Sequence, residues 1–248
     1  MRFLLYNIRY AAGTGSRFHL PFPFAGYLRP TVDNLRRIAE FIKTIHPDVV
    51  GLIEVDSGSY RTIKRNQAEI IADTLGHYHV YQSKYRPDGL VRRLPLFSKQ
   101  GNAIITQHQI RGQRFHYLNH GIKRLVIELE FETCVIFLVH LSIKFRHRHH
   151  QLHDLHELIK QARKPIVVAG DFNSLWGTHE LQLFLAASGL QNANLSNTPS
   201  HPSRAPRRQL DYILHSADIR VTDFFVPNVC LSDHMPLVCD FEIIGNGR

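Results

Sequence analysis

The sequence predicts an α/β (α+β) protein in which two mixed β-sheets pack face to face with helices on the outside. Two observations predict this class: the predicted strands outnumber the predicted helices, and each helix falls between strands. The sequence has no internal repeat at a fixed period and no linker-like stretch. We therefore expect one domain that covers residues 1–248.

The first elements are a strand and a helix separated by a long loop. Phe3–Ile8 is predicted as a strand, and Tyr10–Pro30 is a loop rich in glycine, proline and aromatic residues. A helix should follow, with Thr31 or Asp33 as its N-cap. Its apolar residues recur at helical spacing: Leu35, Ile38, Ile42 and Ile45.

The chain then returns to the sheet. Pro47-Asp48 ends the helix, and the apolar run Val49–Val55 is typical of a buried strand. A second helix is predicted over Thr62–Leu75, with Gly76 as its stop.

The remainder is richer in strands than in helices. Four segments with many β-branched and aromatic residues are predicted as strands: Tyr78–Gln82, Asn102–Thr106, Arg124–Phe131 and Cys134–Leu141. A histidine-rich helix over Arg148–Gln161, a strand over Pro165–Ala169 and a helix over His179–Ser188 follow. Three strands complete the chain: Leu210–Leu214, Ile219–Val226 and Pro236–Ile243.

Composition excludes several classes of protein. The chain is 44% hydrophobic and 21% charged, which is typical of a globular protein and not of a disordered or fibrous one. No apolar run approaches the ~18 residues that a membrane-spanning helix needs, and the start has no signal-peptide pattern. Three scattered cysteines predict neither a disulfide framework nor a zinc site. We expect a cytoplasmic protein.

Chemistry-bearing residues gather where predicted strands end. Seven short motifs lie at such points: Tyr6-Asn7-Ile8, Ile53-Glu54-Val55-Asp56, Gly101-Asn102-Ala103, Val139-His140-Leu141-Ser142, Gly170-Asp171-Phe172-Asn173, Leu210-Asp211-Tyr212 and Leu231-Ser232-Asp233-His234. Carboxylates flanked by apolar residues need a cation or hydrogen-bond donors to offset desolvation. A set of oxygen donors without cysteine suits Mg²⁺ or Mn²⁺ better than zinc.

These motifs, in this order from Tyr6 to Pro236, resemble the endonuclease/exonuclease/phosphatase superfamily, which includes deoxyribonuclease I and the exonuclease III-type repair enzymes. The resemblance implies a four-layer α/β sandwich and a Mg²⁺- or Mn²⁺-dependent phosphoesterase. It also implies that Glu54 is the principal metal ligand, with Asn7 and Asp233 in the metal shell, and that Asn102 orients the cluster.

The resemblance assigns the remaining motif residues to the reaction itself. Asp171 would position or deprotonate the attacking water, while Asn173 and His140 would hold phosphate oxygens. Asp211 would orient His234, which the family uses as a general base or as a stabiliser of the transition state. The reaction would be in-line attack of water on phosphorus.

The expected substrate is an anionic phosphate ester. Five predicted loops should surround the site: Tyr10–Pro30, Lys84–Gln100, Gln107–His120, Lys144–His150 and Thr198–Arg208. They hold 15 of the 30 Lys and Arg residues but only one of the 21 acids, a bias that favours a polyanion such as DNA or RNA. The candidate substrate-binding arginines include Arg93, Arg207 and Arg208.

Three alternatives remain open at this stage. A phospholipid head group or another small phosphate ester fits the same chemistry, and aromatic residues of the first loop either stack on a ligand or pack onto the domain. A catalytically silent relative would bind nucleic acid or membrane through the basic loops without turnover.

The histidine run from His147 to His156 is interpreted as a basic solvated face and not as a metal site.

Overall fold

Two six-stranded sheets dominate the computed structural model, which describes residues 1–15, 30–84, 97–121 and 123–244. The first sheet has the strand order β11-β12-β1-β2-β4-β3. Its strands are β1 (Arg2–Asn7), β2 (Val49–Asp56), β3 (Tyr78–Ser83), β4 (Gln100–Thr106), β11 (Ile219–Phe225) and β12 (Leu237–Ile243). Only β1 and β2 run parallel; the other neighbours are antiparallel.

The second sheet repeats this plan with the order β5-β6-β7-β8-β10-β9. Its strands are β5 (Gly112–Tyr117), β6 (Leu125–Glu130), β7 (Val135–His140), β8 (Ile166–Asp171), β9 (Gln191–Asn192) and β10 (Asp211–His215). The central pair β7 and β8 is parallel and its neighbours are antiparallel. Each sheet therefore has one parallel pair at its centre.

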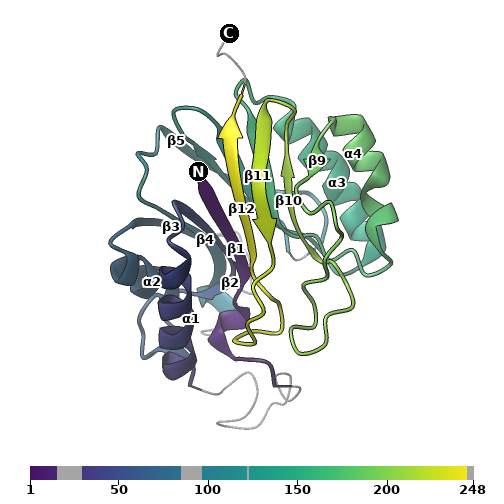
Figure 1. The fold of residues 1–248 in the computed structure, drawn as a ribbon. Coiled ribbons are helices and arrows are strands. Elements are labelled where there is room, and N and C mark those ends of the chain that lie inside the picture. The colour runs from purple at the N-terminus through teal and green to yellow at the C-terminus, as the bar shows by residue number, and fades with distance from the viewer. Residues whose placement is uncertain (16–29, 85–96, 122, 245–248) are drawn as a thin grey trace.

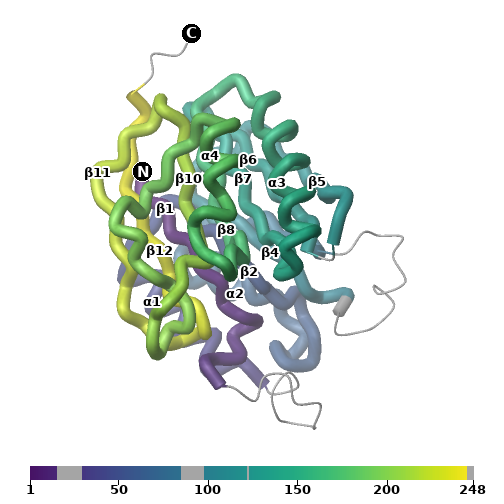
Figure 2. The backbone as a smooth tube through the Cα atoms, turned by 90° about the vertical axis from the view of Figure 1, so that its right-hand side faces the viewer, coloured from purple at the N-terminus to yellow at the C-terminus, as the bar shows by residue number. Residues whose placement is uncertain are grey.

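Helices cover the outer faces of both sheets (Figure 1). They are α1 (Val32–Ile45), α2 (Gln67–Leu75), α3 (Phe145–Ile159) and α4 (Gln182–Ser188). Viewed from the side, α3 and α4 lie in front of the second sheet (Figure 2). The largest apolar cluster lies between the sheets, and two more lie under α1 and α2 and under α3 and α4. This arrangement confirms the four-layer sandwich.

Local chemistry explains where the helices begin. The segment predicted as the start of the second helix, from Thr62, is a 3₁₀ turn, because Ile63 and Lys64 take left-handed backbone angles (φ 53° and 58°). Asn66 then accepts a hydrogen bond from Ala68 N (3.0 Å) and caps α2. The helix α3 begins at Phe145, three residues before the predicted Arg148, so part of the predicted Lys144–His150 loop is helical.

The predicted loop Gln107–His120 contains a strand, β5, that the sequence pattern did not indicate. It is an edge strand whose side chains are mostly polar and partly exposed, and apolar alternation is weak there. Arg114 pairs with Glu128 of β6 (2.5 Å), and nearby Arg111 pairs with Glu132 (2.7 Å). These two arginines therefore have partners within the domain, and the prediction that the whole segment is a loop was wrong.

Candidate active site

The ends of three neighbouring strands place three predicted residues side by side. In the second sheet, His140 of β7 is in register with Asp171 of β8, and Asp171 is in register with Asp211 of β10. Asn7 ends β1 in the opposing sheet, and the sheets bring it against Asp171. The site therefore lies at one edge of the sandwich, between the two sheets.

Asp171 is the centre of this group. It is buried, and Asn7 Nδ2 donates a hydrogen bond of 3.1 Å to its Oδ2. His140 Nε2 lies 3.4 Å and His234 Nε2 lies 4.0 Å from the same oxygen. The other carboxylate oxygen accepts a hydrogen bond from the Asn173 backbone N–H (2.9 Å). These contacts fix the carboxylate in one orientation.

Gly170 permits the close approach of β7 and β8 beside the site. Its φ is +156°, and a Cβ atom at this position would lie 1.9 Å from the Val139 carbonyl oxygen. Only glycine therefore fits, and the strands come close enough to place Asp171 next to His140.

Asp211 and His234 form a short pair. The carboxylate oxygen Oδ2 of Asp211 lies 2.7 Å from His234 Nδ1, and Ser200 Oγ donates to the same oxygen at 2.6 Å. All three side chains are buried. With Nδ1 facing Asp211, the imidazole presents Nε2 toward Asp171, which fits the orienting role of a carboxylate beside histidine.

Glu54 points into the site because its strand is irregular. The pairing of β2 with β4 shifts register between Leu52 and Val55, and Glu54 takes a left-handed φ of 57°. Its backbone N–H donates to Asn102 Oδ1 (3.3 Å). Its Oε1 lies 3.6 Å from Lys123 Nζ and 3.9 Å from His140 Nε2. A non-glycine residue held at positive φ is typical of functional sites.

Asn173 is held in a similar way. Its φ is 51°, and its Nδ2 donates to the Leu141 carbonyl oxygen (3.0 Å). The side chain thus links the segment after β8 to the end of β7.

The electrostatic environment separates the two histidines. Burial lowers the pKa of His140 well below its ordinary value, and the nearby Lys123 lowers it further. Burial alone would also lower the pKa of His234, but the charge of Asp211 and the neighbouring carboxylates outweighs it and raises the value to about 10. Burial raises the pKa of Asp171 to about 6, against the pull of His234.

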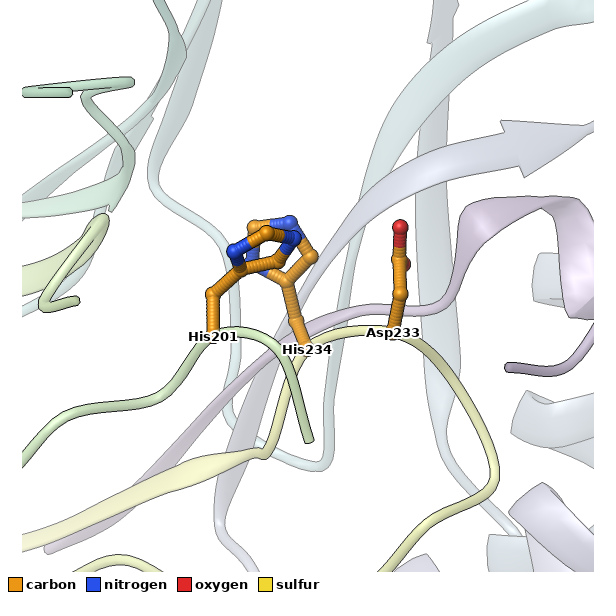
Figure 3. A group of neighbouring side chains, drawn as sticks. All are labelled: His201, Asp233 and His234. Atoms are coloured by element: carbon orange, nitrogen blue, oxygen red, sulfur yellow. The ribbon is translucent and has the colours of Figure 1, made fainter. Parts of the chain in front are cut away.

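Asp233 lies beside His234 and is partly exposed, with 25% of its side chain accessible. Its carboxylate lies 3.2 Å from Arg9 Nε, and Ser232 Oγ donates to it at 3.2 Å. Figure 3 shows the rings of His201 and His234 close together, with Asp233 beside them. The possible ligand atoms of these three residues lie within 4.8 Å of one another.

Comparison with known proteins places the chain in a family. The model of the Endonuclease/Exonuclease/phosphatase family matches residues 4–234, which is nearly the whole chain. The chain belongs to this family. The family includes metal-dependent phosphoesterases, both nucleases and phosphatases.

Solved structures of this family share the fold of the chain. An endonuclease/exonuclease/phosphatase from Beutenbergia cavernae superposes with a TM-score of 0.75 at 20% identity, covering 99% of this chain and 72% of that one. A mannosyl-6-phosphatase from Bacteroides thetaiotaomicron gives a TM-score of 0.73 at 14% identity, covering 98% of this chain and 100% of that one.

A sequence relative adds a second comparison. A UPF0294 protein of Yersinia pseudotuberculosis is 36% identical over 95 residues. The matched segment spans 37% of this chain and 35% of that protein.

The donor set fits the divalent cation that family members typically use. Glu54 and Asp171 each place a carboxylate oxygen within 3.9 Å of His140 Nε2. Asn7 faces Asp171 with its amide nitrogen, and its amide oxygen accepts a hydrogen bond from the Arg9 backbone N–H (3.1 Å). Carboxylate and amide oxygens are the ligands that Mg²⁺ and Mn²⁺ prefer. Asp233 remains a proposed ligand, because its described contacts are with Arg9, Ser232 and the histidines.

Sequence reasoning missed two residues that the structure brings to the site. Lys123 lies between Glu54 and His140, in a segment that carries no motif. His201 packs against His234, with ring centroids 4.7 Å apart, and its buried Nδ1 has no hydrogen-bond partner among the described residues. The sequence offered no signal for Lys123, whereas His201 lies within the predicted loop Thr198–Arg208 but carries no motif that singles it out.

The predicted substrate-binding arginines fall into two groups. Arg207 and Arg208 are exposed in the segment before β10, whose backbone pairs with His201, so they lie at the rim. Arg93 lies outside the described residues. Arg148, counted among the basic loops, is buried against Glu180 and does not face a substrate.

In the described part of the chain, no helix is both long and apolar enough to cross a membrane.

Proposed function

We propose that this chain hydrolyses a phosphodiester by in-line attack of water, with Mg²⁺ or Mn²⁺ as cofactor. The proposal rests on one observation: Asn7, His140 and His234 surround Asp171 at the edge between the sheets. A buried carboxylate that accepts hydrogen bonds from Asn7 and Asn173 and lies beside two histidines can take a proton from water next to a phosphate group.

Each residue has a proposed role that follows from its contacts. Asp171 positions the water and accepts its proton, while Asn173 and His140 donate to phosphoryl oxygens. His234, held by Asp211 and protonated near neutral pH because its pKa is raised to about 10, stabilises negative charge. This assignment favours the stabilising role of His234 over that of general base.

In this proposal Glu54 and Asn7 would hold the cation, which would supply charge neutralisation at the phosphoryl oxygens. Asp233 would complete the metal shell, and Asn102 holds the Glu54 backbone in place. The ammonium group of Lys123 lies between Glu54 and His140 and adds a positive charge to this part of the site.

The substrate class follows from charge. The chain carries a net charge of +9, and Arg204, Arg207 and Arg208 are exposed beside the site. These side chains suit the phosphates of nucleic acid or of a lipid head group.

The test is hydrolysis of plasmid DNA, bis(p-nitrophenyl) phosphate and p-nitrophenyl phosphate, each in Mg²⁺, in Mn²⁺ and in chelator. We expect turnover of a diester that needs metal and falls by about 10³-fold or more in Asp171→Ala and His234→Ala, because each removes a group at the reacting centre. Asp218→Ala, an exposed carboxylate in the turn between β10 and β11, is the matched control. Near wild-type rates in either site variant would refute the assigned roles.

A further inference from the structure

An exposed apolar surface lies beside the site, on the outer side of α3 and α4. We call it the α3–α4 patch; its exposed apolar members are Ile143 (54%), Phe145 (55%), Trp176 (72%) and Leu183 (72%). Phe145, Trp176 and Leu183 line one hollow of about 540 Å³, together with Leu152. Large apolar side chains grouped in this way mark interaction surfaces, whereas single ones do not.

A buried ion pair links the backbone segments that carry Ile143 and Trp176. Arg148 Nη1 donates to the Ile143 carbonyl oxygen (2.8 Å), and Arg148 pairs with Glu180 of the segment before α4. The other carboxylate oxygen of Glu180 accepts a hydrogen bond from the Trp176 backbone N–H (2.7 Å). Arg148 and Glu180 therefore link Ile143 to Trp176, although these two apolar residues lie in different connections of the chain.

The charge of the patch is positive. Lys144 and Arg146 are exposed between and beside the apolar anchors, and His149 stacks on Phe145 with ring centroids 6.4 Å apart. The acidic residue that lines the hollow, Glu180, is neutralised by Arg148 and its side chain is 2% exposed. Aromatic and aliphatic anchors flanked by lysine and arginine are the pattern of a surface that lies on an anionic bilayer.

The patch adjoins the catalytic groups along the chain. Ile143 follows His140 by three residues, and Trp176 follows Asn173 by three residues. A bilayer in contact with Ile143 and Trp176 would thus bring its head groups to the end of β7 and β8 where the site lies.

We propose that the α3–α4 patch docks the protein on an anionic lipid surface and that the phosphodiester it hydrolyses is a phospholipid head group. The first part stands on the patch alone, and the second rests on the proposed function. Apolar anchors enter the interface while Lys144 and Arg146 contact acidic head groups. The hollow beside Leu152 accommodates part of an acyl chain.

The chain carries its own reporter for this proposal, because Trp176 is its only tryptophan. Purified protein is titrated with phosphatidylcholine vesicles that contain or lack phosphatidylserine, and tryptophan emission and co-sedimentation are measured. We expect a blue shift and co-sedimentation with the phosphatidylserine vesicles, both weakened by salt. Phe145→Ser with Leu183→Ser, and Lys144→Glu with Arg146→Glu, should each weaken binding by roughly tenfold or more.

Tyr78→Ser is the matched control, since Tyr78 is an equally exposed aromatic residue on β3 of the other sheet, and its variant should bind like the wild type. Unchanged emission with vesicles, or binding that survives both double variants, overturns the docking proposal. A shift produced instead by single-stranded DNA assigns the patch to nucleic acid. A concentration-dependent shift without vesicles assigns it to self-association.

The two proposals fail separately. Vesicle binding is measured with His234→Ala as well as wild type, so it needs no turnover. The wild type could bind vesicles and cleave bis(p-nitrophenyl) phosphate without releasing a phosphorylated head group from the vesicles. That result would support the docking surface and refute the lipid substrate. If the wild type hydrolyses none of the substrates, the proposed function is refuted, whereas the docking result is unaffected.

Discussion

Asp211 contacts His234 and Ser200 through one carboxylate oxygen. Its Oδ2 lies 2.7 Å from His234 Nδ1 and accepts from Ser200 Oγ at 2.6 Å. The carboxylate thereby fixes the direction of the imidazole and supplies the charge that raises the pKa of His234. At the residue scale, we therefore expect Asp211 to matter for activity through the orientation and charge of His234.

We expect Asp211→Asn to lower kcat by about 10²–10⁴-fold while the fold persists, because an amide neither fixes the tautomer of His234 nor stabilises its charge. Ser200→Ala removes only one neutral hydrogen bond to the same oxygen and should lower kcat far less. Steady-state kinetics on a phosphodiester with circular dichroism as the folding check measures both. Equal losses in the two variants would contradict an electrostatic role for Asp211.

At the element scale, α3 and the connection between β8 and α4 are joined by charge inside the protein. The Arg148 and Glu180 side chains are 1% and 2% exposed, and Arg148 also donates to the carbonyl oxygens of Ser142 and Ile143. A buried ion pair of this kind adds little net stability over an apolar pair, but the loss of one partner leaves a charge without compensation.

Arg148→Met should therefore lower the free energy of unfolding by about 3–5 kcal/mol, measured by urea denaturation. The double variant Arg148→Met with Glu180→Leu should recover much of that loss, because no buried charge remains. A double variant less stable than Arg148→Met alone would contradict this expectation and show that Glu180 contributes more through its hydrogen bond from the Trp176 N–H than its buried charge costs.

At the scale of the whole molecule, the two ends of the chain meet in one sheet. Arg2 of β1 is in register with Asp240 of β12, and its guanidinium donates two hydrogen bonds to the carboxylate (2.8 and 2.7 Å). The same strand β1 pairs in parallel with β2 on its other side. The hydrogen bond from Arg2 lowers the pKa of Asp240 despite some burial.

This pair should make part of the stability depend on pH. Because the folded state lowers the pKa of Asp240, its contribution is present above the unfolded value of about 3.9 and is lost as pH falls through the lowered value. At neutral pH, the free energy of unfolding of the wild type should exceed that of Asp240→Asn by about 1 kcal/mol or less, since the pair is partly exposed. Urea denaturation at neutral and acidic pH should show this difference vanish in acid, and Asp73→Asn, in a more exposed pair, should show a smaller one.

Much of the fold was predictable because periodic burial dictates it. The helix α1 follows the spacing of Leu35, Ile38 and Ile42, all fully buried, and the apolar run before Asp171 forms β8. The edge strand β5 was not predictable, because it is mostly polar and shows no apolar alternation. Its Arg114 pairs with Glu128 of the neighbouring strand β6. Loops and edges depend on neighbours that sequence spacing does not reveal.

The candidate site divides along the same line. By itself the sequence determined the family pattern, the seven strand-end motifs and the oxygen-rich chemistry of Glu54, Asp171 and Asn7. Only the tertiary structure decided that Lys123 and His201 join the site, that Asp233 contacts Arg9, and that Arg148 is buried instead of facing a substrate. The physical reason is that strand ends and core faces follow local periodicity, whereas the partner of a charged side chain is set by the packing of segments far apart in sequence.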